Sequence, residues 1–138
     1  MTSSLIDTLQ DLRARELAAI VQYMRHHYVL TGADGVALAG EFKAVAIEEM
    51  KHAEALGERI DFLGGDPTTK PTEIAKGGKS VADAAQLDVK SEEEAVRLYS
   101  AAIKEADAAG DVVTRRMLED ILADEEGHLD TFRMMLGQ

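Results

Sequence analysis

The chain has 138 residues, 46% of them hydrophobic, which is enough for one domain with a single core, expected to span residues 1–138. Its formal net charge of −11 argues against nucleic acid or an anionic membrane as partner and favours cations as ligands. The absence of cysteine excludes disulfides and thiolate metal sites. No stretch has the length of a membrane span, and the N-terminus lacks an apolar signal segment, so the expected location is cytoplasmic.

Abundant Ala, Leu, Glu and Met, with only two prolines, predict an all-α fold. A first helix is expected from about Ser4 to Leu30, with Glu16 inside its apolar stripe. The segment TGADG at 31–35 is predicted to break the chain. A second apolar stripe follows, and Glu49 and His52 occupy the middle of the helix that carries it.

The segment GGDP at 64–67 is expected to end the second helix, and about 25 residues follow before the next strong helix. Such a length predicts one long crossover that leaves the second and third helices as parallel neighbours. The third helix is expected to begin somewhere within 80–96 and to run to about Ala109. Within it, Glu92 shares a stripe with Tyr99, whereas Glu93 falls on a polar one.

Gly110 and Asp111 supply a short break, after which a fourth helix carries Glu125 and His128 in the middle of its apolar face. The sequence ends at Gln138, so no fifth helix is expected. The predicted fold is therefore a ferritin-like four-helix bundle with one long crossover between the second and third helices.

One spacing occurs twice: a glutamate is followed 33 residues later by Glu-x-x-His. The second copy lies 76 positions after the first, and together they comprise Glu16, Glu49, His52, Glu92, Glu125 and His128. A Glu and a His at i and i+3 share one face of a helix. Four carboxylates on core stripes must be protonated or bind metal, because a buried unpaired charge costs several kcal/mol. The pattern thus predicts two divalent cations, for which iron, manganese and zinc all suit the ligands.

Other residues allow two interpretations. Tyr23 and Tyr99 are also 76 positions apart, and each is equally a phenol for redox chemistry or a buried residue with a satisfied hydroxyl. His26 and His27 have no carboxylate at ligand spacing and are interpreted as ordinary helix residues. Glu48 lies off the core stripe and is predicted to face solvent or the interior of a shell.

Met50 points about 100° away from Glu49 around the helix, so it cannot share the same site. Its own stripe includes the small residues Ala46, Ala53 and Gly57, on what is predicted to be an exposed face. Small residues permit close approach of a partner helix or a flat cofactor. The pattern predicts either a dimer contact or a haem ligand at Met50.

With these residues in hand, the chain resembles the bacterioferritins over all four expected helices, most clearly in RELAAIVQYM, EEMKHAEALGERIDFLGG and DILADEEGHLDTF. The resemblance implies that the six motif residues are ferroxidase ligands, with Glu49 and Glu125 bridging two irons. It implies that Tyr23 takes part in electron transfer. It also implies oxidation of two Fe(II) per chain by O₂ or H₂O₂, storage of ferric mineral in a homo-oligomeric shell, and a b-type haem held between two subunits by Met50.

The expected shell is built from dimers, and twelve subunits are favoured over twenty-four because the family's fifth helix is missing. Alternatives are a peroxide-scavenging di-metal bundle of the rubrerythrin or manganese-catalase kind, a DNA-protecting mini-ferritin, and a metal-free acidic bundle. The lack of cysteine argues against a rubredoxin module. Six ligands in one chain and the lack of a basic tail argue against a mini-ferritin.

Overall fold

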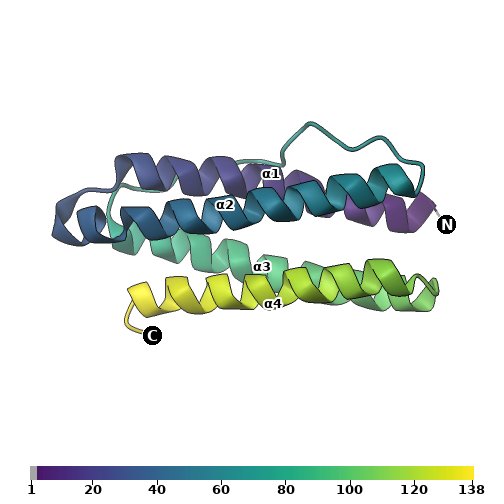
Figure 1. Cartoon of the computed structure of the whole chain (residues 1–138). Helices are drawn as coiled ribbons and strands as arrows, with labels where there is room; N and C mark the ends of the chain where they lie inside the picture. The colour runs from purple at the N-terminus through teal and green to yellow at the C-terminus, as the bar shows by residue number, and fades with distance from the viewer. Residues whose placement is uncertain (1–2) are drawn as a thin grey trace.

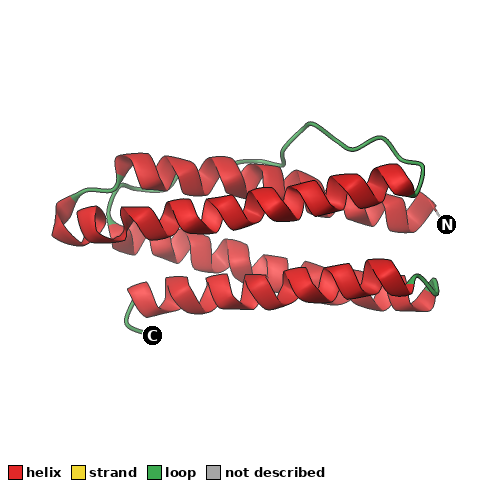
Figure 2. Cartoon of the chain, in the orientation of Figure 1, coloured by secondary structure: helices red, strands yellow, loops and turns green. Residues whose placement is uncertain are grey.

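A computed structural model describes residues 3–138, so the first two residues of the expected domain lie outside the described residues. The described part of the chain contains helices and loops without any strand (Figure 2), which confirms the all-α prediction. The four helices are α1 (Ser3–Val29), α2 (Gly32–Phe62), α3 (Val81–Ala108) and α4 (Val112–Met135).

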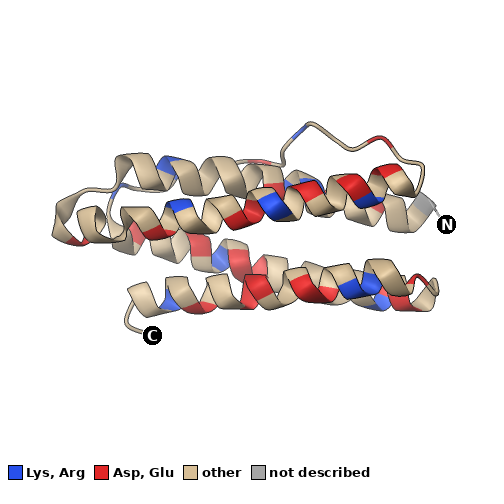
Figure 3. Ribbon diagram, viewed as in Figure 1, with Lys and Arg blue, Asp and Glu red and all other residues tan. Residues whose placement is uncertain are grey.

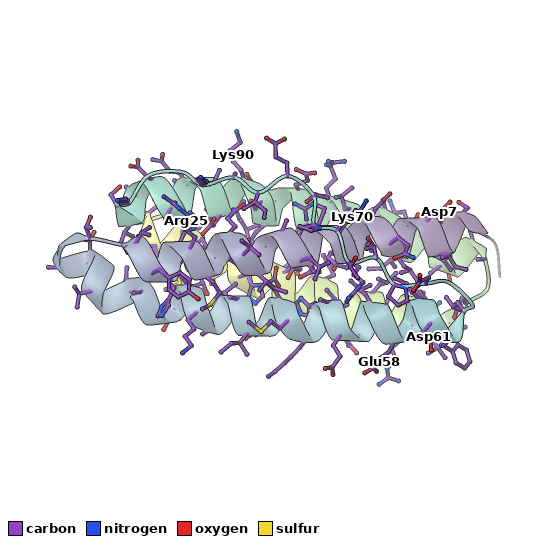
Figure 4. All side chains as sticks on the ribbon, turned by 90° about the horizontal axis from the view of Figure 1, so that it is seen from above. Asp7, Arg25, Glu58, Asp61, Lys70 and Lys90 are labelled. Carbon is purple, nitrogen blue, oxygen red and sulfur yellow. The ribbon has the colours of Figure 1, made fainter. Side chains whose placement is uncertain are left out.

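The helices form two antiparallel hairpins (Figure 1), with α1 packed along α2 and α3 packed along α4. A single long segment joins the hairpins and returns the chain along the length of the bundle, as predicted. Consequently α2 and α3 run in the same direction. They lie diagonally across the bundle and touch only sparsely, rather than side by side as the sequence suggested, because each packs mainly against its hairpin partner (Figure 4).

The helix ends follow local signals in the sequence. Gly32 adopts a left-handed φ of 84° at the start of α2, so the break predicted over 31–35 is shorter than expected. Gly64, with φ 95°, lies just beyond the end of α2, where GGDP was expected to stop the helix. The hydroxyl of Ser80 accepts the Asp83 N–H at 3.1 Å and caps α3. The third helix therefore begins near the earliest predicted position, and the crossover is confined to residues 63–80.

The crossover passes over α1 on its way from α2 to α3 (Figure 4), and polar contacts tie it to that helix along its length. Arg25, marked in that figure, donates to the Lys76 carbonyl at 2.8 Å. Further towards the N-terminus of α1, Gln10 Nε2 donates to the Asp66 carbonyl at 2.6 Å. These contacts fix the crossover against α1 at both ends.

Two apolar clusters fill the bundle on either side of its middle. The first, here the Leu9 cluster, includes Leu5, Leu9, Leu12, Leu56, Ile60, Tyr99, Ala102 and Leu118. The second, here the Phe42 cluster, includes Tyr23, Phe42, Val45, Ala46, Ala84 and Phe132. Burial of these side chains supplies the main favourable term for folding. Charged groups are buried between the two clusters.

Acidic residues are spread over all four helices (Figure 3), consistent with the net charge of −11. Among the described residues, no helix combines the length and the apolar character needed to cross a membrane.

Candidate metal centre

The six residues of the doubled motif converge in the middle of the bundle. α1 and α3 each contribute one glutamate, α2 and α4 each contribute a Glu-x-x-His pair, and every one of these side chains is buried. Their ligand atoms form two groups, each within 4.8 Å: Glu16, Glu49, His52 and Glu125 in one, and Glu49, Glu92, Glu125 and His128 in the other. Glu49 and Glu125 belong to both groups, so these two carboxylates are positioned to bridge two cations.

Each of the six residues also has one buried atom without a hydrogen-bond partner among the described residues. These atoms are Glu16 Oε2, Glu49 Oε1, His52 Nδ1, Glu92 Oε2, Glu125 Oε1 and His128 Nδ1. They face one another: His52 Nδ1 lies 3.0 Å from Glu49 Oε1 and 3.2 Å from Glu125 Oε1. Buried polar atoms normally have partners, because leaving them unpaired costs about 1–3 kcal/mol each. A pair of divalent cations among these oxygens and nitrogens would satisfy all six.

Burial and crowding of like charges perturb the protonation of this cluster. Burial, followed by repulsion from neighbouring carboxylates, raises the pKa of Glu16 and Glu49. Burial likewise raises the pKa of Glu92 to about 8. Burial acts in the same direction on Glu125, but the two imidazoles, whose Nδ1 atoms lie 3.2 and 3.3 Å from Glu125 Oε1, outweigh it and lower its pKa. The metal-free cluster therefore retains protons that a cation would displace.

The two histidines are held from behind by carboxylates of the opposite hairpin. His52 Nε2 lies 2.9 Å from Asp124 Oδ2, and His128 Nε2 lies 2.7 Å from Glu48 Oε2. Such contacts leave Nδ1 of each ring facing the centre and fix the ring orientation. Glu48 is half-exposed, as expected, but its contact with His128 was not predicted. The signal was available, because Glu48 and Asp124 are also 76 positions apart and precede the two bridging candidates.

Both tyrosines are buried against the centre. Tyr23 Oη donates to Glu92 Oε1 at 2.7 Å, and Tyr99 Oη donates to Glu16 Oε1 at 2.6 Å. Of the two interpretations offered by the sequence, the satisfied hydroxyl describes their hydrogen bonding. A redox role for Tyr23 stays a prediction.

The interpretation of His26 as an ordinary helix residue is wrong. His26 is fully buried, with Nδ1 2.8 Å from Asp88 Oδ2 and Nε2 2.8 Å from the Lys76 carbonyl. Gln22 Nε2 donates to Asp88 Oδ1 at 2.8 Å and to Ser91 Oγ at 3.1 Å. We refer to Gln22, His26, Asp88 and Ser91 as the His26 network. Asp88 comes from α3, 62 positions along the chain, so no local spacing reveals the pair. His27 Nδ1 lies 2.7 Å from the Ala39 carbonyl and its ring packs edge-on against Tyr28, in agreement with the prediction of an ordinary helix residue.

The stripe around Met50 is less exposed than predicted. Met50 itself is 43% exposed, but Ala46, Ala53 and Gly57 are buried. The reason is the packing of α1: Arg13 donates to the Ala53 carbonyl, and a Cβ on Gly57 would lie 3.1 Å from Arg13 Nη1. The small residues thus serve contact between α1 and α2, and Met50 remains on the exposed edge.

A cavity of about 470 Å³ leads to the centre from the side of the crossover. α1, α3 and residues 72–75 form its walls, and we refer to it as the crossover cavity. Its lining grades from the exposed Thr72 and Glu73 to the buried Glu16 and Glu92. The centre is thus approached by an acidic, partly open path.

A four-helix bundle with one long crossover, whose core holds two overlapping groups of carboxylates and imidazoles, defines the class of ferritin-like di-metal proteins. The Ferritin family model, described as a ferritin-like domain, matches residues 6–138. The chain belongs to this family and, within it, to the bacterioferritins.

Individual relatives agree with this assignment. A bacterioferritin from Desulfovibrio desulfuricans is 40% identical over 127 residues, which cover 92% of this chain and 71% of that protein. The X-ray structure of the D. desulfuricans bacterioferritin, which describes a diiron site in different catalytic states, matches with a TM-score of 0.89 and 37% identity over 96% of this chain and 78% of that chain. A ferritin-like, diiron-carboxylate protein from Bacillus anthracis matches with a TM-score of 0.93 and 27% identity over 99% of both chains.

Proposed function

We propose that this protein is a ferroxidase for iron storage and detoxification, which binds two Fe(II) per chain and oxidises them with O₂ or H₂O₂. The observation that carries the proposal is the pair of overlapping ligand groups that share Glu49 and Glu125 and leave six inward-facing atoms unpaired. Membership of the bacterioferritins and the diiron site of the D. desulfuricans relative support iron as the substrate.

In this proposal Glu16 and His52 bind one iron, Glu92 and His128 bind the other, and the two remaining glutamates bridge them. Two divalent cations bring four positive charges to four carboxylates and two neutral imidazoles, so the occupied site is close to neutral. Iron supplies the redox chemistry. The chain orients the ligands through the carboxylates behind the histidines and through the tyrosine hydroxyls, and releases protons as cations bind.

The proposal extends to storage of ferric mineral inside a cytoplasmic homo-oligomeric shell, with residues 1–138 as one ferritin-like domain and a dimer as the building block. A twelve-subunit shell is proposed ahead of one with twenty-four. Native mass spectrometry separates the two, and a monodisperse monomer of 15.0 kDa would overturn any shell.

A haem site at Met50 is part of the same proposal. Met50 and Ile47 are 43% and 40% exposed on one side of α2. A second copy of the chain would bring its own Met50 to this side, so that the two methionines would hold one haem iron. Met50→Leu is expected to remove the Soret band of purified protein without slowing iron oxidation. Haem retained by that variant would show that Met50 is not the ligand.

The main experiment measures iron oxidation. Metal-free protein is mixed anaerobically with two Fe(II) per chain, air or H₂O₂ is admitted, and the ultraviolet absorbance of ferric iron is followed. Glu49→Ala and Glu125→Ala are each expected to slow the rapid phase by roughly 100-fold or more, because both irons lose a shared ligand. Glu93→Ala, an exposed position beside Glu92, is the matched control. Equal rates in all four proteins would overturn the assignment.

Rates with the two oxidants also test the alternative of peroxide scavenging. Continuous peroxide consumption without net accumulation of ferric iron would favour a peroxide-scavenging bundle over a storage protein. The DNA-protecting alternative lacks support, because all six candidate ligands converge within one chain.

A further inference from the structure

The crossover cavity has a well-fixed outer wall. The Thr72 N–H donates to the Ala14 carbonyl at 3.1 Å, and the Lys76 carbonyl is held by Arg25 and His26. Between these two anchors, Glu73 and Ala75 face the cavity. Anything that enters between α1 and α3 therefore passes this short stretch of backbone.

The opposite side of the centre is bridged by side chains. There, His52 contacts Asp124 and His128 contacts Glu48, so two hydrogen bonds join α2 to α4. By contrast, the crossover cavity is lined directly by four of the candidate ligand carboxylates: Glu16, Glu49, Glu92 and Glu125. The cavity is thus the direct approach to the carboxylates in this chain.

Arg15 is the only positively charged residue among the described residues that line the cavity. Its Nη2 donates to the Ser91 carbonyl at 3.2 Å, and its Nε lies 3.7 Å from Glu94 Oε1. Arg15 thus reaches from α1 to α3 on the way to the buried carboxylates. The Arg15 side chain is 20% exposed and that of Glu94 is 52% exposed, so their ion pair is partly solvated.

A structural role alone explains this placement poorly. A partly solvated ion pair contributes little to stability, typically less than about 1 kcal/mol. An acidic cavity concentrates cations and speeds their arrival, whereas a fixed guanidinium inside it repels them. Neutral O₂ and H₂O₂ experience neither effect.

We propose that Arg15 is a specificity-determining residue of the entry path, which restrains the arrival of cations at the metal centre and leaves neutral oxidants unaffected. Glu73 and Glu94, at the outer part of the cavity, have the opposite effect and attract the cation. This inference rests on the proposed function only in taking Fe(II) as the physiological cation.

The test uses the full chain, freed of metal, and Co(II) as a spectroscopic probe in stopped-flow mixing. Arg15→Gln is expected to raise the bimolecular rate of Co(II) binding by roughly three- to tenfold at low ionic strength, and Arg15→Lys to leave it close to wild type. Glu73→Gln is expected to lower the rate. Arg97→Gln removes the same charge from an exposed position on α3 outside the cavity, and it should match wild type.

Two further measurements separate charge from structure. Raising the salt concentration should bring the Arg15→Gln and wild-type rates together, because screening removes a purely electrostatic difference. The rate at which H₂O₂ oxidises protein already holding Fe(II) should be the same in both. Co(II) rates that are equal in Arg15→Gln, Arg97→Gln and wild type would overturn the proposal, as would a difference that persists at high salt.

If Arg15→Gln unfolds, the Glu73→Gln variant decides the matter alone, since an unchanged Co(II) rate there also overturns the proposal. Failure of the proposed function is distinguishable from failure of this inference. If the wild-type protein does not oxidise Fe(II), the proposed ferroxidase function is wrong. The Co(II) rates test the role of Arg15 separately, because Co(II) binding involves no redox step.

Discussion

The two ends of the bundle solve the same packing problem with different chemistry. Gln22, His26 and Asp88 lie on one side of the centre, and the positions related to them by the repeat of 76 residues are Leu98, Ala102 and Leu12. Those three belong to the Leu9 cluster or pack against it. One half of the repeat is therefore filled with apolar side chains where the other buries an ion pair and an amide.

The two halves of the repeat share their candidate ligands but differ in the side chains that fill the core around them. The Leu9 cluster demonstrates that apolar side chains suffice to pack these positions. A buried ion pair is often no better for stability than such a replacement, because removal of two charges from water offsets their attraction. The His26 network differs from the Leu9 cluster in one respect: His26 is hydrogen-bonded to the crossover through the Lys76 carbonyl. Polar side chains at this end hold the crossover backbone over the cavity, which explains why only this end contains them.

The largest expected effect on stability comes from removing one member of the His26–Asp88 pair. His26→Leu should destabilise the metal-free protein by about 3–5 kcal/mol, because Asp88 is left as a buried charge without its partner. The double variant His26→Leu/Asp88→Leu should recover most of that loss, since it copies the apolar chemistry of the other end. Urea unfolding of the three proteins measures both numbers. A double variant as unstable as the single one would contradict the view that apolar packing is sufficient there.

The matched change at the other end is Leu12→Ala. Leu12 is 3% exposed, and truncating it should cost about 2–5 kcal/mol because a void remains in the core. The positions that correspond to His26 and Gln22 at this end are the apolar Ala102 and Leu98, so the destabilisation caused by Leu12→Ala should not change with pH. A pH-dependent cost for Leu12→Ala would mean that the two ends are electrostatically coupled.

The pH dependence of stability should distinguish the ends further, with a smaller effect. Burial would lower the pKa of His26, but its hydrogen bond to Asp88 outweighs this and raises the pKa. Burial also raises the pKa of Asp88. Both shifts mean that the native pair holds protons more tightly than the unfolded chain. Its contribution is therefore complete in acid and declines as the pH rises above about 4 for Asp88 and about 6.5 for His26.

The measurement is the difference in unfolding free energy between wild type and His26→Leu/Asp88→Leu. Taking this difference cancels the titration of the metal centre, which both proteins share. The difference should shift in favour of the double variant from pH 5 to pH 9. A difference that is flat, or that shifts towards wild type, would show that the pair does not hold its protons as inferred.

How much of this was accessible from sequence depends on the range of the interaction. Glu92 was separated from Glu93 by helical periodicity, and the structure buries the first and exposes the second. The two groups of candidate ligands follow from one repeat, because spacing along a helix fixes which side chains share a face. His26 and Asp88 could not be paired in the same way. They come from different hairpins, and only the packing of α1 against α3 brings them together.

The crossover illustrates the same limit. Its length predicts that α2 and α3 run in the same direction, but length alone does not say whether they are adjacent or diagonal in the bundle. The choice depends on apolar faces meeting across the whole bundle, and the predicted exposure of the small residues around Met50 is wrong for the same reason, although Met50 itself is exposed. Arg13 on α1 covers Ala53 and Gly57, a contact that the α2 stripe by itself does not reveal.

The smallest expected difference lies between the two tyrosines, which occupy equivalent places in the repeat but different surroundings. Tyr23 lines the crossover cavity, whereas Tyr99 is enclosed in the Leu9 cluster. Each Tyr→Phe change removes a hydrogen bond to a buried carboxylate, worth about 1 kcal/mol net. Water in the cavity can replace the bond lost in Tyr23→Phe, so that variant should be destabilised less than Tyr99→Phe.

The same asymmetry should affect iron oxidation. Tyr23→Phe is expected to slow the oxidation of Fe(II), because a phenol beside the cavity can exchange electrons and protons with the substrate. Tyr99→Phe should slow the rate less, since Tyr99 does not line the cavity and only helps to orient Glu16. Stopped-flow oxidation and urea unfolding of both variants, side by side, provide the check. Equal rates and equal stabilities would mean that the two tyrosines are equivalent. The position of Tyr23 beside the crossover cavity would then have no effect on iron oxidation.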